Sequence, residues 1–326
     1  MLRRTSIPAA LLCALVAACT PAADEEPTRA GRSPTQTATT ASPNPEALTG
    51  NGTAGLPPEL AKALRGKPAE ARSAGRVVDQ IVAAERAIAD PRTRPDVLAA
   101  AGHLQQVAYR ELGARPGWDD RVRAALPRDL VTVVRDNVAS RREFRSMHPQ
   151  ARSDLSDELP AWRIVRPAPA RTLRAAYDEA EERFGVDWNY LAAINLVETG
   201  LGRIRGTSVA GAQGPMQFIP STWAIYGRGN INSVHDSIMA AGRFLQDQGF
   251  TEPGGRPEAL YRYNNSTAYV RGVTLLAELM DRRPRAFDGY YHWQVYYLTS
   301  KGSVLLPEGY RATQPIPVKR WLARHP

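Results

Sequence analysis

Residues 191–226 of this 326-residue chain, LAAINLVETGLGRIRGTSVAGAQGPMQFIPSTWAIY, carry its most informative sequence pattern. The stretch opens on an uncharged apolar run, which is typical of a buried helix, and we expect that helix to cover about 188–198. Glycine and proline then recur through 199–232, which predicts loop with short pieces of structure. Glu198 is the first charged side chain after the apolar run.

The carboxyl group of Glu198 is the first candidate for chemistry. At helical spacing it shares a face with Leu191, Ile194 and Asn195. Such surroundings disfavour the ionised form and raise the pKa of a carboxyl group, which suits it to protonate a leaving-group oxygen near neutral pH. Taken alone, however, a glutamate at a helix end more often simply reaches solvent.

The loop after Glu198 carries side chains that suit a carbohydrate, which has hydroxyls to satisfy and an apolar ring face to stack. Uncharged hydrogen-bonding groups and flat apolar faces occur together there: Ser208, Gln213, Gln217, Phe218, Trp223 and Tyr226. A phosphate would call for a basic loop. A metal would call for clustered histidine or cysteine, and the five histidines show no such spacing, so we expect neither metal nor cofactor.

Three separated sequence blocks follow a known signature. They read Glu198-Thr199, then Ser208, Gly211, Ala212, Gly214, Met216, Gln217 and Pro220, and then Tyr263-Asn264. Together they resemble the lysozyme-like lytic transglycosylases of SLT type, which cleave peptidoglycan. The sequence around Glu198 and Gln217 also resembles that of the B-type membrane-bound murein transglycosylases. Residues 214–223 most resemble the sequences of actinobacterial lipoproteins of this kind.

The resemblance implies a fold and a role for each matched residue. The fold would be mainly α, with a lysozyme-like α+β catalytic domain over about 170–282. Glu198 would be the catalytic acid and base, and Ser208 and Tyr263 would hold its carboxyl group by hydrogen bonds. The residues that would contact or shape the substrate site are Ser208, Met216, Gln217, Phe218, Trp223, Tyr226, Tyr263 and Asn264.

The match contains one carboxylate, whereas ordinary glycosidases use two. The resemblance therefore implies that Glu198 protonates the oxygen leaving N-acetylmuramic acid and then takes the proton of the C6 hydroxyl of the same sugar. That hydroxyl would close a 1,6-anhydro ring without consuming water. If Asp187, Asp236 or Asp247 faced the cleft, a hydrolytic muramidase would become credible. A non-catalytic peptidoglycan-binding lipoprotein is the alternative from another class.

Around this region the sequence predicts further elements. Helices are expected at 170–184, with Gly185 as the C-cap, at 235–248 and at 257–281, and Asp187 is expected to cap the helix that follows it. Residues 150–169 are predicted to be a linker. Residues 283–326 are predicted to be an extension with a β-hairpin, because Val295 and Tyr297 alternate with their neighbours.

Helical apolar stripes over 59–149, such as Val77, Ile81 and Ile88, predict a helical accessory domain. No catalytic constellation lies there. The sequence gives no role for this region, and proteins of cell-wall synthesis or division are possible partners.

The N-terminus reads as an export signal. Arg3 and Arg4 precede a short apolar run, which is typical of a signal peptide over 1–18. The signal ends at Cys19 in a sequence that resembles the bacterial lipobox, so Cys19 is predicted to carry lipid. Residues 19–58, mostly Thr, Pro, Ala, Gly, Ser and Asn after this cysteine, are predicted to be a disordered tether.

These features predict an exported protein that is lipid-anchored to the outer face of the cytoplasmic membrane. Its partners would be peptidoglycan glycan strands and the membrane, through the anchor. The formal net charge is +9, but export argues against nucleic acid as a partner. No other apolar run approaches the ~20 residues that a spanning helix needs, which argues against a polytopic membrane protein.

Overall fold

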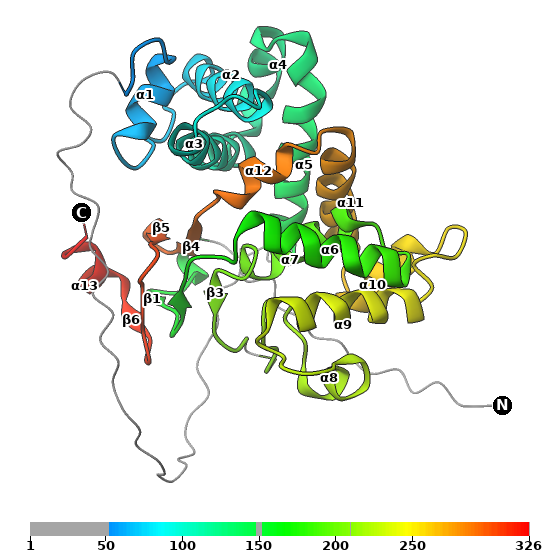
Figure 1. Ribbon diagram of the computed structural model, residues 1–326. Coiled ribbons are helices and arrows are strands. Elements are labelled where there is room, and N and C mark those ends of the chain that lie inside the picture. Colours follow the sequence, from blue (N-terminus) through cyan, green and yellow to red (C-terminus); the bar gives the residue numbers. More distant parts are fainter. Residues whose placement is uncertain (1–51, 148–151, 209, 326) are drawn as a thin grey trace.

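The computed structural model describes residues 52–147, 152–208 and 210–325 (Figure 1). The predicted signal peptide, Cys19 and most of the predicted tether lie outside the described residues. Within them the chain is mainly α with a few short strands, which confirms the predicted fold class. None of the helices described is long and apolar enough to cross a lipid bilayer.

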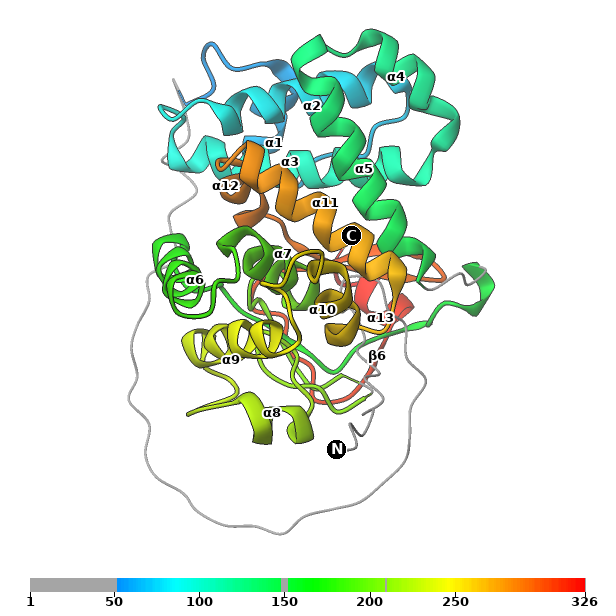
Figure 2. The same ribbon diagram turned by 90° about the vertical axis from the view of Figure 1, so that its right-hand side faces the viewer.

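The N-terminal helices gather at one end of the molecule (Figures 1 and 2). Their bounds are α1 Pro58–Leu64, α2 Ala74–Ala89, α3 Pro95–Ala114, α4 Asp119–Ala125 and α5 Val131–Ser146. Ser73 caps α2, because its Oγ accepts a hydrogen bond from the backbone N–H of Arg76. The stripe of Val77, Ile81 and Ile88 predicted from the sequence is buried, so these helices have an apolar core of their own.

The second group of helices surrounds α7. The bounds are α6 Ala170–Phe184, α7 Trp188–Thr199, α8 Pro220–Tyr226, α9 Val234–Asp247, α10 Arg256–Tyr263 and α11 Thr267–Arg282. Helix α7 lies near the middle of this group, with α6, α9 and α11 packed on it (Figures 1 and 2). Leu191 and Ile194 have no exposed surface. The helix is apolar on nearly every side because it is buried on every side.

Helices α5 and α11 join the two groups. The hydroxyl of Ser140 on α5 donates a hydrogen bond to the carbonyl oxygen of Gly272 on α11 across 2.9 Å. Phe144 lies directly over Gly272, where an added Cβ would come 2.6 Å from Cζ of the ring. Only glycine allows α5 and α11 to approach this closely, so the predicted accessory helices pack directly on the helices around α7.

Within the described ranges the strands form three small two-stranded antiparallel sheets. Strand β1 (Glu158–Leu159) pairs with β6 (Ile316–Pro317), and β2 (Arg163–Ile164) pairs with β3 (Ile204–Arg205). The segment predicted to be a linker therefore contributes two strands. Strand β4 (Val295–Thr299) pairs with β5 (Gly302–Leu306) as the hairpin that the sequence predicts.

The remaining helices, α12 (Ala286–Tyr291) and α13 (Val318–Leu322), lie either side of this hairpin along the chain. Helix α12 packs on α3 of the N-terminal group. Just after α12, the side-chain amide of Gln106 on α3 donates a hydrogen bond to the carbonyl oxygen of Gln294 across 2.7 Å. The C-terminal part of the chain thus returns to the N-terminal helices.

Candidate active site

Glu198 lies one residue before the end of α7, and its side chain is fully buried. The helix carries no charge from Trp188 to Val197, so it can pack on all sides and bring the carboxyl group into the interior. Gly200 then ends the helix in the left-handed conformation, at φ 61°, which glycine adopts at little cost.

A buried polar network fixes the following loop to the end of α7. The carbonyl oxygen of Pro215 accepts hydrogen bonds from Thr199 Oγ1 at 2.6 Å and from Asn195 Nδ2 at 2.8 Å. Thr199 Oγ1 also accepts from the N–H of Gly202, and the hydroxyl of Tyr177 donates to Asn195 Oδ1. This anchor was not predicted from the sequence. The signal that could have found it is the pair of uncharged polar residues, Asn195 and Thr199, inside the apolar run.

The two oxygens of the Glu198 carboxyl group have different surroundings. Oε1 accepts a hydrogen bond from the hydroxyl of Tyr269 across 2.9 Å. Oε2 is buried and has no hydrogen-bond partner among the described residues. Burial raises the pKa of Glu198 to about 8, and the Tyr269 hydrogen bond lowers it in part. The carboxyl group is therefore mostly protonated at neutral pH and can donate from an oxygen that nothing else holds.

Tyr263 does not make the contact that the family resemblance implies. Its hydroxyl donates to the carbonyl oxygen of Met216 across 2.7 Å, while Tyr269 is the tyrosine that reaches Glu198. The rings of Tyr263 and Tyr269 are stacked with centroids 6.4 Å apart and an interplanar angle of 7°. Tyr263 thus bonds to the backbone of Met216 and stacks on Tyr269, and Tyr269 holds the carboxyl group.

A break between α10 and α11 decides which tyrosine reaches the carboxyl group. The sequence predicts one helix over 257–281, and this prediction is wrong because the backbone of Asn264 is extended at φ −140°. Ser266 then caps a new helix, its Oγ accepting from the N–H of Tyr269 at 3.3 Å. Tyr269 consequently lies in the first turn of α11, which packs against α7.

Ser208 also differs from the role that the resemblance implies. Its Oγ accepts a hydrogen bond from the N–H of Ala212 at 3.0 Å, and its own N–H donates to the carbonyl oxygen of Ala212 at 2.9 Å. The hydroxyl therefore closes a turn within its own loop. In the part of the chain that the structure describes, Ser208 forms no hydrogen bond with Glu198, because Ser208 is bonded to the backbone of Ala212 instead.

A row of aromatic rings leads toward Glu198. Phe218 packs edge-on against Trp223 at 5.8 Å and against Tyr263 at 5.9 Å between centroids. Tyr263 in turn stacks on Tyr269, the hydrogen-bond donor to the carboxyl group. Trp223 is only half-buried, so the row runs from the surface of α8 to the buried acid.

The remaining predicted site residues are more scattered in their contacts. Gln217 is buried with a positive φ of 52°, and its amide donates to the carbonyl oxygen of Gly214 at 3.0 Å. Asn264 is also buried, at the start of the break. The hydroxyl of Tyr226 donates to Asp247 across 2.5 Å, which ties α8 to α9. Asp247 is one of the three rival carboxylates, the aspartates 187, 236 and 247 that could serve a hydrolytic mechanism if they faced the cleft.

Asp187, the second rival carboxylate, forms an ion pair with Arg256 across 2.6 Å. It was predicted to cap α7, but its side chain makes no capping hydrogen bond. The N–H of Trp188 instead donates to Glu181 at 2.9 Å, which satisfies the helix start. The carboxylate of Asp187 is therefore engaged with α10.

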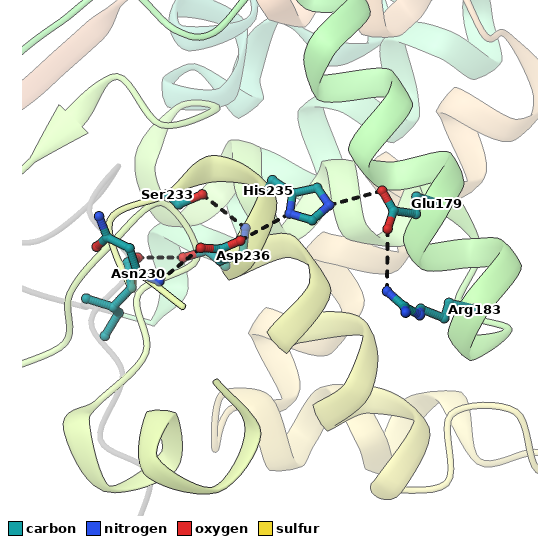
Figure 3. A network of polar contacts seen from close by, with 8 residues as sticks. Glu179, Arg183, Asn230, Ser233, His235 and Asp236 are labelled. Atoms are coloured by element: carbon teal, nitrogen blue, oxygen red, sulfur yellow. Dashed lines mark hydrogen bonds and ion pairs between the residues drawn. The ribbon is translucent and has the colours of Figure 1, made fainter. Parts of the chain in front are cut away.

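Asp236, the third rival, belongs to a surface network between α6 and α9 (Figure 3). It accepts from the N–H of Asn230 at 2.9 Å and pairs with His235 at 3.1 Å, and His235 also contacts Glu179 at 3.0 Å. Although histidine and carboxylates meet here, no group of three or more His, Cys, Asp or Glu among the described residues is placed to hold a metal ion.

Comparison with known proteins bears on residues 175–277, which match the family model described as the transglycosylase SLT domain. The chain is also 26% identical, over 178 residues, to the protein named membrane-bound lytic murein transglycosylase F from Thiobacillus denitrificans. That alignment spans 53% of this chain and 37% of the relative. No solved structure matches the chain. Through residues 175–277 the chain therefore carries a transglycosylase SLT domain, the lysozyme-like family that its motifs resemble.

Proposed function

We propose that this protein is a peptidoglycan lytic transglycosylase and that Glu198 is its catalytic acid and base. The observation that carries the proposal is the state of this carboxyl group. It is fully buried, its pKa is raised to about 8, and its Oε2 has no partner among the described residues. A protonated carboxyl group with an unengaged oxygen is the group that a departing glycosidic oxygen needs. The SLT domain and the name of the relative support the same activity.

The proposed reaction uses one carboxyl group twice. Glu198 gives its proton to the oxygen that leaves C1 of N-acetylmuramic acid, and the C1–oxygen bond breaks as positive charge builds on the ring. The ionised Glu198 then takes the proton from the C6 hydroxyl of the same sugar while that oxygen forms a bond to C1. The products are a 1,6-anhydro sugar and a free hydroxyl on the leaving N-acetylglucosamine, no water is consumed, and Glu198 is protonated again.

The engagement of the other carboxylates supports this one-carboxylate route. Asp187 pairs with Arg256, Asp236 with His235, and Asp247 accepts from Tyr226. An inverting hydrolase would need a second carboxylate about 6.5–9.5 Å from the acid to activate water, and a retaining one would need it about 5–5.5 Å away. A carboxylate fixed in such contacts is poorly suited to either role.

The aromatic row is the proposed beginning of the substrate groove. Trp223 and Phe218 would stack on sugar rings, while the polar groups of Gln217 and Asn264 would contact hydroxyls or acetamido groups. Met216 and Tyr263 would shape the wall beside the acid, and Ser208 and Tyr226 would line the groove further out. Because the carboxyl group is buried, a bound strand has to displace side chains that now cover it.

We also propose that the protein is exported and anchored to the outer face of the cytoplasmic membrane by lipid on Cys19. The lipobox-like sequence ending at this cysteine supports the anchor. The relative is named as membrane-bound, which is in keeping with such a location. The helices over 58–146 would then be available to proteins of wall synthesis or division.

The experiment that tests the activity compares three proteins on purified peptidoglycan. Wild type is expected to release soluble fragments, and Glu198→Gln is expected to release none while keeping its circular dichroism spectrum. Glu258→Gln is the matched control, because Glu258 is an exposed glutamate on α10 that pairs with Arg262 on the same helix. A Glu198→Gln protein that cleaves at the wild-type rate would overturn the assignment. A wild-type protein that binds peptidoglycan but does not cleave it would indicate a glycan-binding lipoprotein.

A further inference from the structure

A cavity of about 670 Å³ lies between the N-terminal helices and the SLT domain. Its walls come from α3, α5, the end of α7, α11 and the hairpin β4–β5. Part of the wall is apolar, with Leu155, Leu276 and Trp293. Cavities of 300–1,000 Å³ typically take organic ligands of drug size, so this one is large for a single inorganic ion.

The polar part of the wall carries an excess of positive charge. Arg110, Arg141 and Arg145 line the cavity, and none of them forms an ion pair with a carboxylate in the described part of the chain. Glu70 lies on the same wall and partly offsets the charge of Arg110. Among the described residues no carboxylate offsets Arg141, whose pKa is lowered by burial and by the charges of Arg110 and Arg145.

The other charged groups of the wall are already matched. Arg142 forms an ion pair with Asp119 at 2.7 Å, and Glu111 pairs with Arg115. Lys301 lies 3.8 Å from Asp157. The positive charge of the wall that no carboxylate matches is therefore that of Arg141 and Arg145, with Arg110 beside them.

Arg110 and Arg141 are held in place by their surroundings. The guanidinium group of Arg110 lies 4.3 Å from the ring centroid of Tyr296 and donates a hydrogen bond to Ser303 Oγ on the hairpin. The aliphatic part of Arg141 lies against Gly113 of α3, where an added Cβ would come 3.1 Å from Cδ of the arginine. Guanidinium groups held close together without carboxylates repel one another, and an anion bound between them would relieve that repulsion.

The cavity ends next to the candidate active site. Leu196 and Val197, the two residues before Glu198, form part of its wall. Phe144 also lines it, and the centroid of this ring lies 6.4 Å from that of Tyr269, which holds the carboxyl group. Phe144 thus touches both the cavity and the ring of the tyrosine that holds the carboxyl group.

We propose that this cavity binds the carboxylates of the peptide stem attached to N-acetylmuramic acid, with Arg141 as the central contact. The inference rests on the proposed function, because it assigns the peptide part of the same substrate. A guanidinium group matches a carboxylate in two parallel hydrogen bonds. The apolar wall would receive the aliphatic parts of the peptide, which distinguishes this ligand from a free inorganic anion.

The test measures binding, so it does not depend on cleavage. The probe is the synthetic peptide L-Ala-γ-D-Glu-L-Lys-D-Ala, titrated calorimetrically into the purified protein. Arg141→Gln is expected to weaken binding at least tenfold, and the same peptide with amidated carboxylates is expected to bind wild type at least tenfold more weakly. Arg123→Gln is the matched control, because Arg123 is exposed on α4 and pairs with Asp120 of the same helix.

Three results would overturn the proposal: no binding of the peptide to wild type, equal binding to Arg141→Gln, or displacement of the peptide by an equal concentration of inorganic phosphate. The Glu198→Gln protein should bind the peptide as wild type does. If wild type binds the peptide but does not cleave peptidoglycan, the proposed activity is refuted and the peptide site is supported. If wild type cleaves peptidoglycan but does not bind the peptide, the activity is supported and the peptide site is refuted.

Discussion

The hydroxyl of Tyr269 donates a hydrogen bond to Oε1 of Glu198 across 2.9 Å, joining the first turn of α11 to the end of α7. The ring of Tyr269 is buried between Tyr263, which stacks on it, and Phe144 of α5, which meets it edge-on. The N-terminal helices thus support the residue that orients the candidate acid. This arrangement gives the helices over 58–146 a structural role in the site.

Tyr269→Phe should slow cleavage about tenfold and move its alkaline limit upward. The hydrogen bond favours the ionised carboxylate, so its loss raises the pKa of Glu198 further and makes the first, proton-donating step harder. Hydrogen bonds to charged groups contribute about 1.5–3 kcal/mol, which corresponds to a tenfold effect or more. The measurement is the rate of fragment release between pH 5 and pH 10.

Tyr263→Phe is the matched comparison for this change. Its hydroxyl bonds to the carbonyl oxygen of Met216 and not to the carboxyl group. We therefore expect a loss of stability of about 1–2 kcal/mol and no shift of the pH profile. If Tyr263→Phe shifts the profile and Tyr269→Phe does not, the assignment of the holding residue is wrong.

The buried acid should make stability depend on pH in a way that Glu198→Gln removes. The pKa of Glu198 is about 8 in the folded protein against a usual 4.5, so the folded state prefers the protonated form. Below pH 4.5 the carboxyl group is protonated in both states and costs the folded protein nothing. As the pH rises from 4.5 to about 8, the free energy of unfolding of the wild-type protein falls. At about 1.4 kcal/mol per pKa unit, the loss approaches at most about 5 kcal/mol above pH 8.

Urea unfolding of wild type and Glu198→Gln at pH 4.5, 6.5 and 8.5 measures this difference. At each step in pH the free energy of unfolding of Glu198→Gln should rise relative to that of wild type, because glutamine has no proton to lose and the two proteins share all other titrating groups. A difference in the free energy of unfolding that stays constant from pH 4.5 to pH 8.5 would show that Glu198 ionises normally.

Thr199→Val should destabilise the protein by about 2–3 kcal/mol although it preserves shape. The change leaves the N–H of Gly202 without its acceptor and takes one of two donors from the carbonyl oxygen of Pro215. A buried polar group left unsatisfied costs about 1–3 kcal/mol. Thr199→Ser, which keeps the hydroxyl, should lose clearly less, and equal losses in the two variants would mean that the hydroxyl contributes nothing.

Gly272→Ala should loosen the contact between α5 and α11 and cost about 1–3 kcal/mol, because the added methyl group would meet the ring of Phe144. Adding Phe144→Leu removes the obstacle and should restore part of the loss. Thermal unfolding of both single variants and the double variant gives the coupling. Additive losses would indicate that the two helices do not pack as described.

Sequence patterns predicted much of this architecture. The uncharged run ending at Glu198 predicted the buried helix, and Gly185 was predicted to end the preceding helix, where it has a φ of 67°. Alternation around Val295 predicted the hairpin β4–β5. These features depend on neighbouring residues alone, which is why a local pattern reveals them.

Features that depend on distant parts of the chain were missed. The pairing of β1 with β6 joins residues 158–159 to 316–317, and neither short segment carries a strand pattern. The choice of Tyr269 over Tyr263 depends on the break at Asn264, which ends α10, and on the cap at Ser266, which starts α11. The arginines of the cavity lie on α3 and α5, and only packing brings them next to α7.

If Glu198 alone serves as acid and then as base, the mass of the fragment ends must show it. Wild-type protein is incubated with purified peptidoglycan, and the released muropeptides are weighed by mass spectrometry. We expect ends of 1,6-anhydro-N-acetylmuramic acid, lighter by one water than reducing ends, from the wild-type protein and none of them from Glu198→Gln. Reducing ends from the wild-type protein would contradict it, because they require a water molecule and a carboxylate to activate it.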